Sequence, residues 1–89
     1  MTWTLKLSSD AKANLAKIGT AEARRILKFL YGRVRELPHP RALGEALSGR
    51  FTGLWRYHVG DYRILCEIQD EKITILVVLV GHRRKIYNK

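Results

Sequence analysis

The chain has 89 residues, with 17 Lys and Arg against 8 Asp and Glu, which gives a formal net charge of +9. At roughly 100–200 residues per domain, this length predicts a single domain spanning residues 1–89. A hydrophobic content of 46% with 2 prolines excludes a disordered chain, and 1 cysteine excludes both a disulfide framework and a cysteine-based zinc site. The strong positive charge indicates a polyanionic partner, either nucleic acid or an acidic protein.

The first half of the chain predicts one strand followed by two helices. Apolar and polar residues alternate over 2–7, which is typical of a half-buried strand. Candidate N-cap residues at 8–10 open a helix that Gly19 ends, and Thr20 is expected to cap a second, longer helix. This second helix ends before Pro38 and turns one apolar stripe towards the core. The stripe consists of Ala23, Ile26, Leu27, Leu30, Val34 and Leu37.

The second half predicts an antiparallel meander. Residues 38–53 form a connector with one helical turn at 42–47, and the segments after it are rich in β-branched and aromatic residues. Turns at 60–61 and 70–71 separate these segments, and such short connections force neighbouring strands to run antiparallel. The expected strands are 54–59, 62–68 and 72–80. The fold class is therefore α+β in the order β-α-α-β-β-β, with one mainly antiparallel sheet packed against the N-terminal helix pair.

A two-residue turn at Gly60-Asp61 sets the register of the first two meander strands. Counting outward from this turn, Arg56, His58 and Arg63 fall on one face, where directly opposed Cβ atoms lie about 5 Å apart. The other face is apolar and covers the helices; it carries Trp55, Tyr57, Val59, Tyr62, Ile64 and Cys66. Two arginines and a histidine gathered on an open face repel one another unless an anion lies between them. The cluster therefore predicts a phosphate site.

The last strand runs back towards this cluster. Because it is antiparallel to the strand before it, its end at Val80-Gly81 returns to the edge that holds Gly60 and Arg63. The segment after it leaves the sheet beside the cluster. Its polar residues are His82, Arg83, Arg84, Lys85 and Tyr87.

A turn at 70–71 has a consequence for the same face. It places Leu65, Leu76 and Val78 beside His58. An apolar strip next to a basic cluster suits an acidic, amphipathic segment of a partner protein laid across the sheet.

Two motifs in the second half resemble a known family. Residues 54–64, LWRYHVGDYRI, followed by residues 80–87, VGHRRKIY, are similar to the RelE branch of the RelE/ParE toxins. These toxins are the toxic halves of bacterial and archaeal type II toxin–antitoxin pairs. The resemblance covers nearly the whole chain, since the N-terminal strand, the helix pair and the Leu47-Ser48-Gly49 connector also fit.

This resemblance implies an enzyme and its partners. RelE-like toxins are small endoribonucleases that cleave mRNA in the ribosomal A site without a metal or other cofactor. The ribose 2′-OH attacks the adjacent phosphate, which leaves a 2′,3′-cyclic phosphate and a 5′-OH. The resemblance also implies a cognate RelB-like antitoxin that holds the toxin inactive, and contact with operator DNA only through the toxin–antitoxin complex.

The family's active-site positions correspond to Arg56, His58, Arg63, Arg83 and Tyr87. His58 is the best general base in the chain, because imidazole titrates near neutral pH, although its position is a lysine in some well-known members. Arg63 and Arg83 are expected to hold phosphate oxygens and stabilise developing charge, and Arg56 to grip the backbone. Tyr87 either stacks on a base or shares the proton relay. The other expected substrate-binding residues are Arg84 and Lys85.

Two other functions are compatible with these residues. One is a ParE-like toxin that binds DNA gyrase without catalysis, and the other is a plain RNA- or DNA-binding module. Simpler roles also exist for single residues: His58 as a solvent-facing strand residue, Arg56 and Arg63 as charges that keep an open sheet face in solution, and Tyr87 as packing on the sheet edge. The motif at 81–84 together with Tyr87 favours the enzyme.

No segment predicts export or a membrane role. The longest apolar run, 73–80, is interrupted by Thr74 and is far shorter than the roughly 20 residues of a spanning helix. Residues 1–5 lack a charged start followed by an apolar stretch, which a signal peptide requires. We expect a cytoplasmic protein with no membrane partner.

Overall fold

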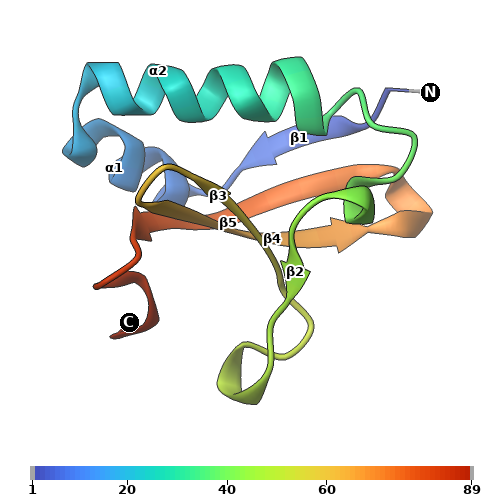
Figure 1. Ribbon diagram of the computed structural model, residues 1–89. Helices are drawn as coiled ribbons and strands as arrows, with labels where there is room; N and C mark the ends of the chain where they lie inside the picture. The colour runs from blue at the N-terminus through green and yellow to red at the C-terminus, as the bar shows by residue number, and fades with distance from the viewer. Residues whose placement is uncertain (1, 89) are drawn as a thin grey trace.

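The computed structural model describes residues 2–88 and packs two helices against one face of a five-stranded sheet (Figure 1). The strand order is β1-β5-β4-β3-β2, in which β1 pairs parallel with β5 and the other neighbours pair antiparallel. The predicted α+β class is confirmed. The elements are β1 (Thr4–Leu7), α1 (Ser9–Ile18), α2 (Thr20–Phe29), β2 (Glu45–Ala46), β3 (Trp55–Val59), β4 (Tyr62–Gln69) and β5 (Thr74–His82). Among residues 2–88, no helix has the length and apolar character needed to cross a membrane.

Ser8 and Gly19 mark the ends of α1. The Ser8 hydroxyl accepts a hydrogen bond from the Ala11 backbone N–H at 3.0 Å and donates one to the Val78 carbonyl at 2.7 Å, so the helix start is tied to β5. The prediction that Thr20 caps α2 is wrong, because Gly19 is the N-cap and Thr20 is the first helical residue. The sharp turn between the helices requires the φ of 100° that Gly19 adopts, and glycine reaches this conformation at little steric cost.

The apolar stripe of α2 forms the centre of the core. Ile26, Leu30 and Val34 follow one another at intervals of four residues, and each is fully buried. The helix does not continue in α-helical geometry as far as Pro38, since Leu30–Val34 form a π-helical turn. The sheet residues that share this core are Tyr57, Ile64, Cys66, Ile75, Val77 and Val80.

The hairpin of β3 and β4 has the register that the sequence predicted. His58 lies opposite Arg63, and Arg56 lies opposite Leu65. The two-residue turn depends on Gly60, whose φ is 58°. Side chains alternate between the two faces of a strand, so this register alone separates the basic residues from the core residues.

The turn before β5 is longer than predicted. Instead of two residues, Asp70–Lys72 form a 3₁₀ turn, and Ile73 follows at a φ of 47°, a left-handed conformation that is rare for a β-branched residue. β5 therefore begins at Thr74. Its far end still returns to the predicted edge, where Gly81 lies opposite Arg63.

A β-bulge in β5 shifts its register against β4 and so changes which side chains meet across these two strands. The pairing shifts between Leu65 and Cys66, so that Val78 is an extra residue and Leu79 lies opposite Leu65. Leu65 is fully buried and contributes no exposed surface. Leu65, opposite Arg56, and Leu76, opposite Glu67, lie on the predicted face, but the predicted pairing of this strip is wrong because a bulge and a longer turn cannot be counted from strand periodicity. Of the strip, only Leu76 and Val78 are half-exposed.

The connector contains a short strand that the sequence analysis did not predict. In place of a helical turn at 42–47, Pro40–Ala42 form a 3₁₀ turn and Glu45–Ala46 form β2, which pairs with β3. Gly44 makes this close approach possible. Its φ is 83°, and a Cβ atom at this position would lie 2.3 Å from the backbone oxygen of Arg56.

Candidate active site

The hairpin of β3 and β4 presents its basic side chains on the sheet face that points away from the helices. Tyr57 and Ile64 are buried on the helix side, and Arg56, His58 and Arg63 alternate with them towards the other side. The His58 side chain is exposed, and its backbone lies directly opposite Arg63. The predicted grouping of these three residues on one face is present in the structure.

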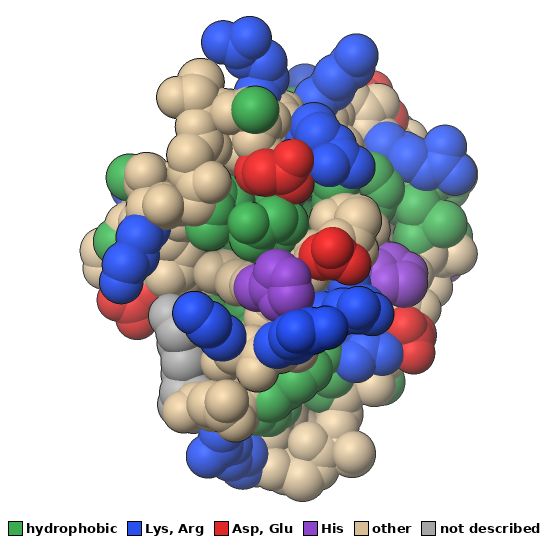
Figure 2. All heavy atoms as spheres, turned by 60° about the vertical axis from the view of Figure 1, so that its left-hand side comes forward, with side chains coloured by type: hydrophobic (Ala, Val, Ile, Leu, Met, Phe, Trp, Pro, Cys, Tyr) green, Lys and Arg blue, Asp and Glu red, His purple; other side chains and the backbone are tan. Residues whose placement is uncertain are grey.

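The C-terminal segment brings Arg83 to the hairpin turn. The Arg83 backbone N–H donates to the Asp61 carbonyl at 2.8 Å, and its guanidinium Nε lies 3.6 Å from Asp61 Oδ1. Arg63 reaches the same turn, where its Nη1 donates to the Gly60 carbonyl at 3.1 Å. His58, Arg63 and Arg83 thus lie at one corner of the sheet. Figure 2 shows Lys and Arg side chains gathered beside the histidines on this side of the molecule.

Tyr87 is joined to this corner through Arg56. The Nη1 of Arg56 donates to the Tyr87 hydroxyl oxygen at 2.7 Å. The Phe51 ring meets Tyr87 edge-on at a centroid distance of 5.8 Å, and Arg50 donates to the Tyr87 backbone carbonyl. The hydrogen bonds to Tyr87 and then to Glu45 raise the pKa of Arg56. The phenol is therefore held at the edge of the basic cluster.

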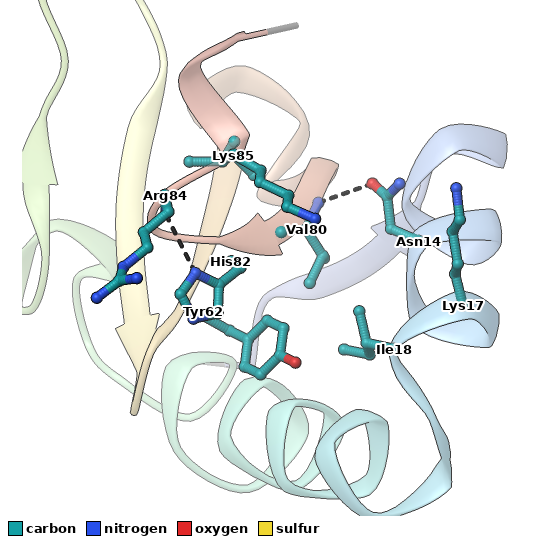
Figure 3. A pocket seen from close by; sticks show the side chains of 10 residues that line it. Asn14, Lys17, Ile18, Tyr62, Val80, His82, Arg84 and Lys85 are labelled. Atoms are coloured by element: carbon teal, nitrogen blue, oxygen red, sulfur yellow. Dashed lines mark hydrogen bonds between the residues drawn. The ribbon is translucent and has the colours of Figure 1, made fainter.

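Arg84 and Lys85 face a different surface. They line a cavity of about 520 Å³ between α1 and the C-terminal segment (Figure 3). His82 lines it too; its Nδ1 accepts a hydrogen bond from the Arg84 backbone N–H at 3.2 Å, and its ring centroid lies 5.7 Å from that of Tyr62. None of the four residues predicted to be catalytic, all within the described range, lines this cavity. Arg84 and Lys85 therefore line a surface to which these four residues do not contribute.

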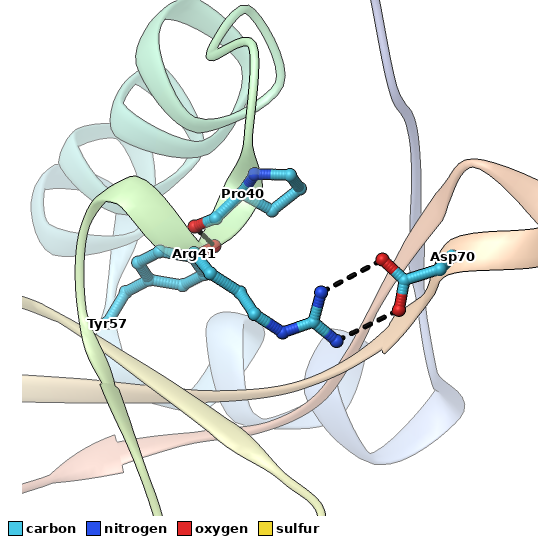
Figure 4. A network of polar contacts seen from close by, with 4 residues as sticks. All are labelled: Pro40, Arg41, Tyr57 and Asp70. Atoms are coloured by element: carbon cyan, nitrogen blue, oxygen red, sulfur yellow. Dashed lines mark hydrogen bonds and ion pairs between the residues drawn. The ribbon is translucent and has the colours of Figure 1, made fainter.

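The connector that leads into β2 is held at two points. Arg41 forms a bidentate ion pair with Asp70, with N–O distances of 2.9 and 3.0 Å (Figure 4). The Tyr57 hydroxyl donates to the Pro40 carbonyl. Burial raises the pKa of Tyr57, so this hydroxyl stays protonated and can act as a donor. These contacts hold the connector against both β3 and the turn before β5.

Glu45 is a residue of this site that the sequence motifs did not indicate. β2 places it directly opposite Arg56, and its Oε2 lies 2.7 Å from the Arg56 Nη2. The hydrogen bond and the charge of Arg56 lower the pKa of the Glu45 carboxyl, with smaller contributions from His58 and Arg63. A carboxylate therefore lies among the cations. One signal was available, since Glu45 is the only acidic residue in 37–60.

The arrangement combines a proton acceptor with groups that bind phosphate. The exposed imidazole of His58 carries a ring nitrogen that can accept a proton. The guanidiniums of Arg63 and Arg83 offer paired donors that match phosphate oxygens, and Tyr87 adds a phenol hydroxyl. Within residues 2–88, no group of three or more His, Cys, Asp or Glu side chains is placed to hold a metal ion. This corner can bind a phosphodiester and transfer a proton.

Comparison with known proteins shows which proteins the chain is similar to. The family model described as ParE toxin of type II toxin-antitoxin system, parDE, matches residues 5–87. Toxin RelG of Mycobacterium tuberculosis is 27% identical over 89 residues, which is 100% of both chains. A chain in the toxin–antitoxin complex RelBE2 from the same organism has a TM-score of 0.84 at 25% identity, covering 93% of each chain. The archaeal RelE–RelB complex of Pyrococcus horikoshii has a TM-score of 0.72 at 27% identity, covering 93% of this chain and 97% of that one.

Proposed function

The chain belongs to the RelE/ParE family of toxins from type II toxin–antitoxin systems, and on that premise we propose that it is a ribosome-dependent endoribonuclease that cleaves mRNA in the A site. The observation that carries the proposal is the position of His58 directly opposite Arg63, with Arg83 at the adjoining turn. This pairing sets a proton acceptor beside two phosphate-binding groups. A toxin that only binds a protein target has no need of that combination.

The proposed reaction is an internal transfer at one phosphodiester. The ribose 2′-oxygen forms a bond to phosphorus while the bond from phosphorus to the 5′-oxygen breaks, which leaves a 2′,3′-cyclic phosphate and a 5′-OH. His58 accepts the 2′-OH proton, and the departing 5′-oxygen takes up a proton from Tyr87 or from water. Arg63 and Arg83 stabilise the charge that develops on the phosphate oxygens, while Arg56 holds the strand.

The ribosome supplies geometry that the toxin alone does not impose. Attack on phosphorus requires the 2′-oxygen to lie in line with the departing 5′-oxygen. An mRNA bent in the A site holds these atoms close to that alignment, which is worth several kcal/mol. The open, solvent-facing site at the corner of the sheet is suited to an RNA that is already positioned.

We expect His58→Ala and Arg83→Ala to lower A-site cleavage by about 10²-fold or more, the usual loss when an acid–base or charge-stabilising group is removed. Both side chains are exposed, so both variants should fold. The measurement is the rate at which new mRNA 5′ ends appear on programmed ribosomes, mapped to single nucleotides.

Lys72→Ala is the matched control for this experiment. It also removes one exposed positive charge, but at the turn before β5, at the other end of β4 from the hairpin turn. Its cleavage rate should equal that of the wild type. Wild-type rates for both His58→Ala and Arg83→Ala would contradict the proposed roles.

The matching family model gives a second candidate function. It is described as a ParE toxin, and ParE-like relatives act on DNA gyrase rather than on RNA. The same assay separates the two, since gyrase poisoning gives DNA breaks and leaves mRNA on ribosomes intact. The RelE-like structures that share this fold, and the basic corner described above, favour the RNA target.

We also infer that a RelB-like antitoxin neutralises this toxin in the cytoplasm. The similar structures from Mycobacterium tuberculosis and Pyrococcus horikoshii are toxin–antitoxin complexes, which supports such a partner. With a net charge of +9, the toxin should attract an acidic antitoxin segment. Operator DNA should then be contacted through the complex rather than by the toxin alone.

A further inference from the structure

The free protein already holds an anion at its proposed phosphate site. The Glu45 carboxylate lies 2.7 Å from Arg56, the residue expected to grip the RNA backbone. Because cross-strand partners share a face, Glu45 lies on the same sheet face as His58 and Arg63. The carboxylate is thus positioned where a phosphate oxygen of bound RNA is expected.

The fold fixes this placement rather than leaving it to a mobile side chain on a loop. Gly44 runs so close to β3 that any side chain there would collide with the backbone of Arg56. On the other side of β2, the Leu47 N–H donates to the Leu54 carbonyl at 3.1 Å. Glu45 is therefore held opposite Arg56 from both ends of the strand, and only its outer part is free to move.

The two members of this ion pair differ in exposure. The Arg56 side chain is 24% exposed and is also bonded to Tyr87, whereas the Glu45 side chain is 55% exposed. When an RNA phosphate approaches, Glu45 can swing into solvent while Arg56 stays in place. The lowered pKa of Glu45 keeps the carboxyl ionised at neutral pH, so the exchange displaces a charged group.

We infer that Glu45 is a specificity-determining residue that competes with RNA phosphate for Arg56 and so weakens binding of free, single-stranded RNA. The inference rests on the proposed function, because it assigns Arg56 to the RNA backbone. Random RNA must displace the carboxylate using only its own weak contacts. RNA that the ribosome has positioned gains additional contacts and overcomes the competition. Glu45 therefore restricts the toxin to delivered substrate.

The test uses the full chain and an RNA of about 12 nucleotides in which every 2′-OH is replaced by 2′-O-methyl, so that no cleavage occurs. Glu45→Gln keeps an acceptor oxygen for Arg56 but removes the charge. We expect it to bind this RNA about fivefold more tightly than the wild type at low salt. The dependence of log Kd on log salt should steepen by about 0.7, the value for one further neutralised phosphate of a single strand.

Glu71→Gln is the matched control, because it makes the same charge change at the turn before β5. That turn follows the end of β4, whereas Arg56, the partner of Glu45, lies opposite Leu65, four residues before that end, which is roughly 13 Å along the strand. Because Glu71 forms no ion pair with an arginine among residues 2–88, we expect its effect on Kd at the same salt concentration to be less than about twofold. In a protein that also carries Arg56→Gln, the gain from Glu45→Gln should disappear.

Three results overturn the inference. Glu45→Gln could bind no more tightly than Glu71→Gln, its gain could survive in the Arg56→Gln background, or Glu45→Ala could fail to show the same tightening. Melting temperatures of all variants verify that folded protein is compared. The binding measurement is independent of cleavage: absence of cleavage on ribosomes refutes the proposed enzyme, whereas absence of tighter binding refutes only the role of Glu45.

Discussion

Charged side chains are paired differently at the two ends of β4. Near the hairpin turn, Arg56 and Arg83 have exposed carboxylate neighbours that an RNA phosphate can replace. At the other end, Arg41 holds Asp70 in a bidentate pair that pins the connector. The first group of contacts is suited to ligand exchange, and the second is suited to stability.

From the ion pair between Arg41 and Asp70 we predict how the stability of the fold depends on pH. The hydrogen bond from Arg41, and then its charge, lower the pKa of Asp70 in the folded state. Because the pKa of Asp70 is lower in the folded state, its ionised carboxylate stabilises the fold at pH values above the unfolded pKa of about 3.9. This stabilisation is lost as the pH falls through the pKa of the folded state. Asp70→Asn should therefore melt at a lower temperature than the wild type at pH 7, with the difference shrinking below about pH 4.

Thermal melts from pH 7 down to pH 3 test this expectation. Glu71→Gln, a neighbouring carboxyl with no ion pair among the contacts of residues 2–88, serves as the control. A melting difference for Asp70→Asn that does not change with pH would show that the carboxylate charge is not what stabilises this contact.

Among the elements, β2 depends most on a single residue. Gly44 combines a φ of 83° with a backbone oxygen 2.3 Å from where its Cβ would lie, whereas Gly53 has a φ of 98° and open space around it. Gly53→Ala should lose about 1–2 kcal/mol of unfolding free energy through backbone strain alone. Gly44→Ala should lose at least about 1 kcal/mol more, because the methyl group also forces β2 away from β3.

Urea unfolding of the two glycine variants measures this difference directly. If both variants lose the same unfolding free energy, the added methyl group at position 44 is accommodated at no extra cost. The prediction that β2 is held tightly against β3 would then be wrong. A displaced β2 would also separate Glu45 from Arg56, so Gly44→Ala should share the tighter RNA binding expected of Glu45→Gln.

The reactivity of the Cys66 thiol measures how well the core of the whole fold is packed. Cys66 lies at the centre of the sheet, fully buried, and burial raises the pKa of its thiol. Thiol reagents react with the thiolate, so folded protein should react at least about 10²-fold more slowly than protein in denaturant. Because the chain has 1 cysteine, the reaction reports only this position.

The rate of thiol modification at increasing denaturant checks this prediction. The rate should rise together with the loss of secondary structure, since the core that buries Cys66 joins both helices to the sheet. Fast reaction under native conditions would mean that the sheet opens locally without global unfolding.

The most predictable part of the candidate site was the hairpin that holds His58 and Arg63. A two-residue turn and strict alternation of side chains are local properties, so counting from Gly60 gave the register found in the structure. The return of the last strand to Arg63 followed from the same antiparallel rule and survived both the longer turn and the bulge. The amphipathic stripe of α2 was equally local.

Contacts between distant segments were beyond such counting. The parallel pairing of β1 with β5 and the placement of Glu45 opposite Arg56 each join segments that share no short turn to set their register. The bulge at Val78 lies between strands that do share a turn, but the alternation of side chains does not indicate an extra residue. Periodicity and turn chemistry act over a few neighbouring residues and specify which face a side chain takes. Which distant segment meets that face depends on how the complete core packs and on where the backbone can approach closely, as it does at Gly44.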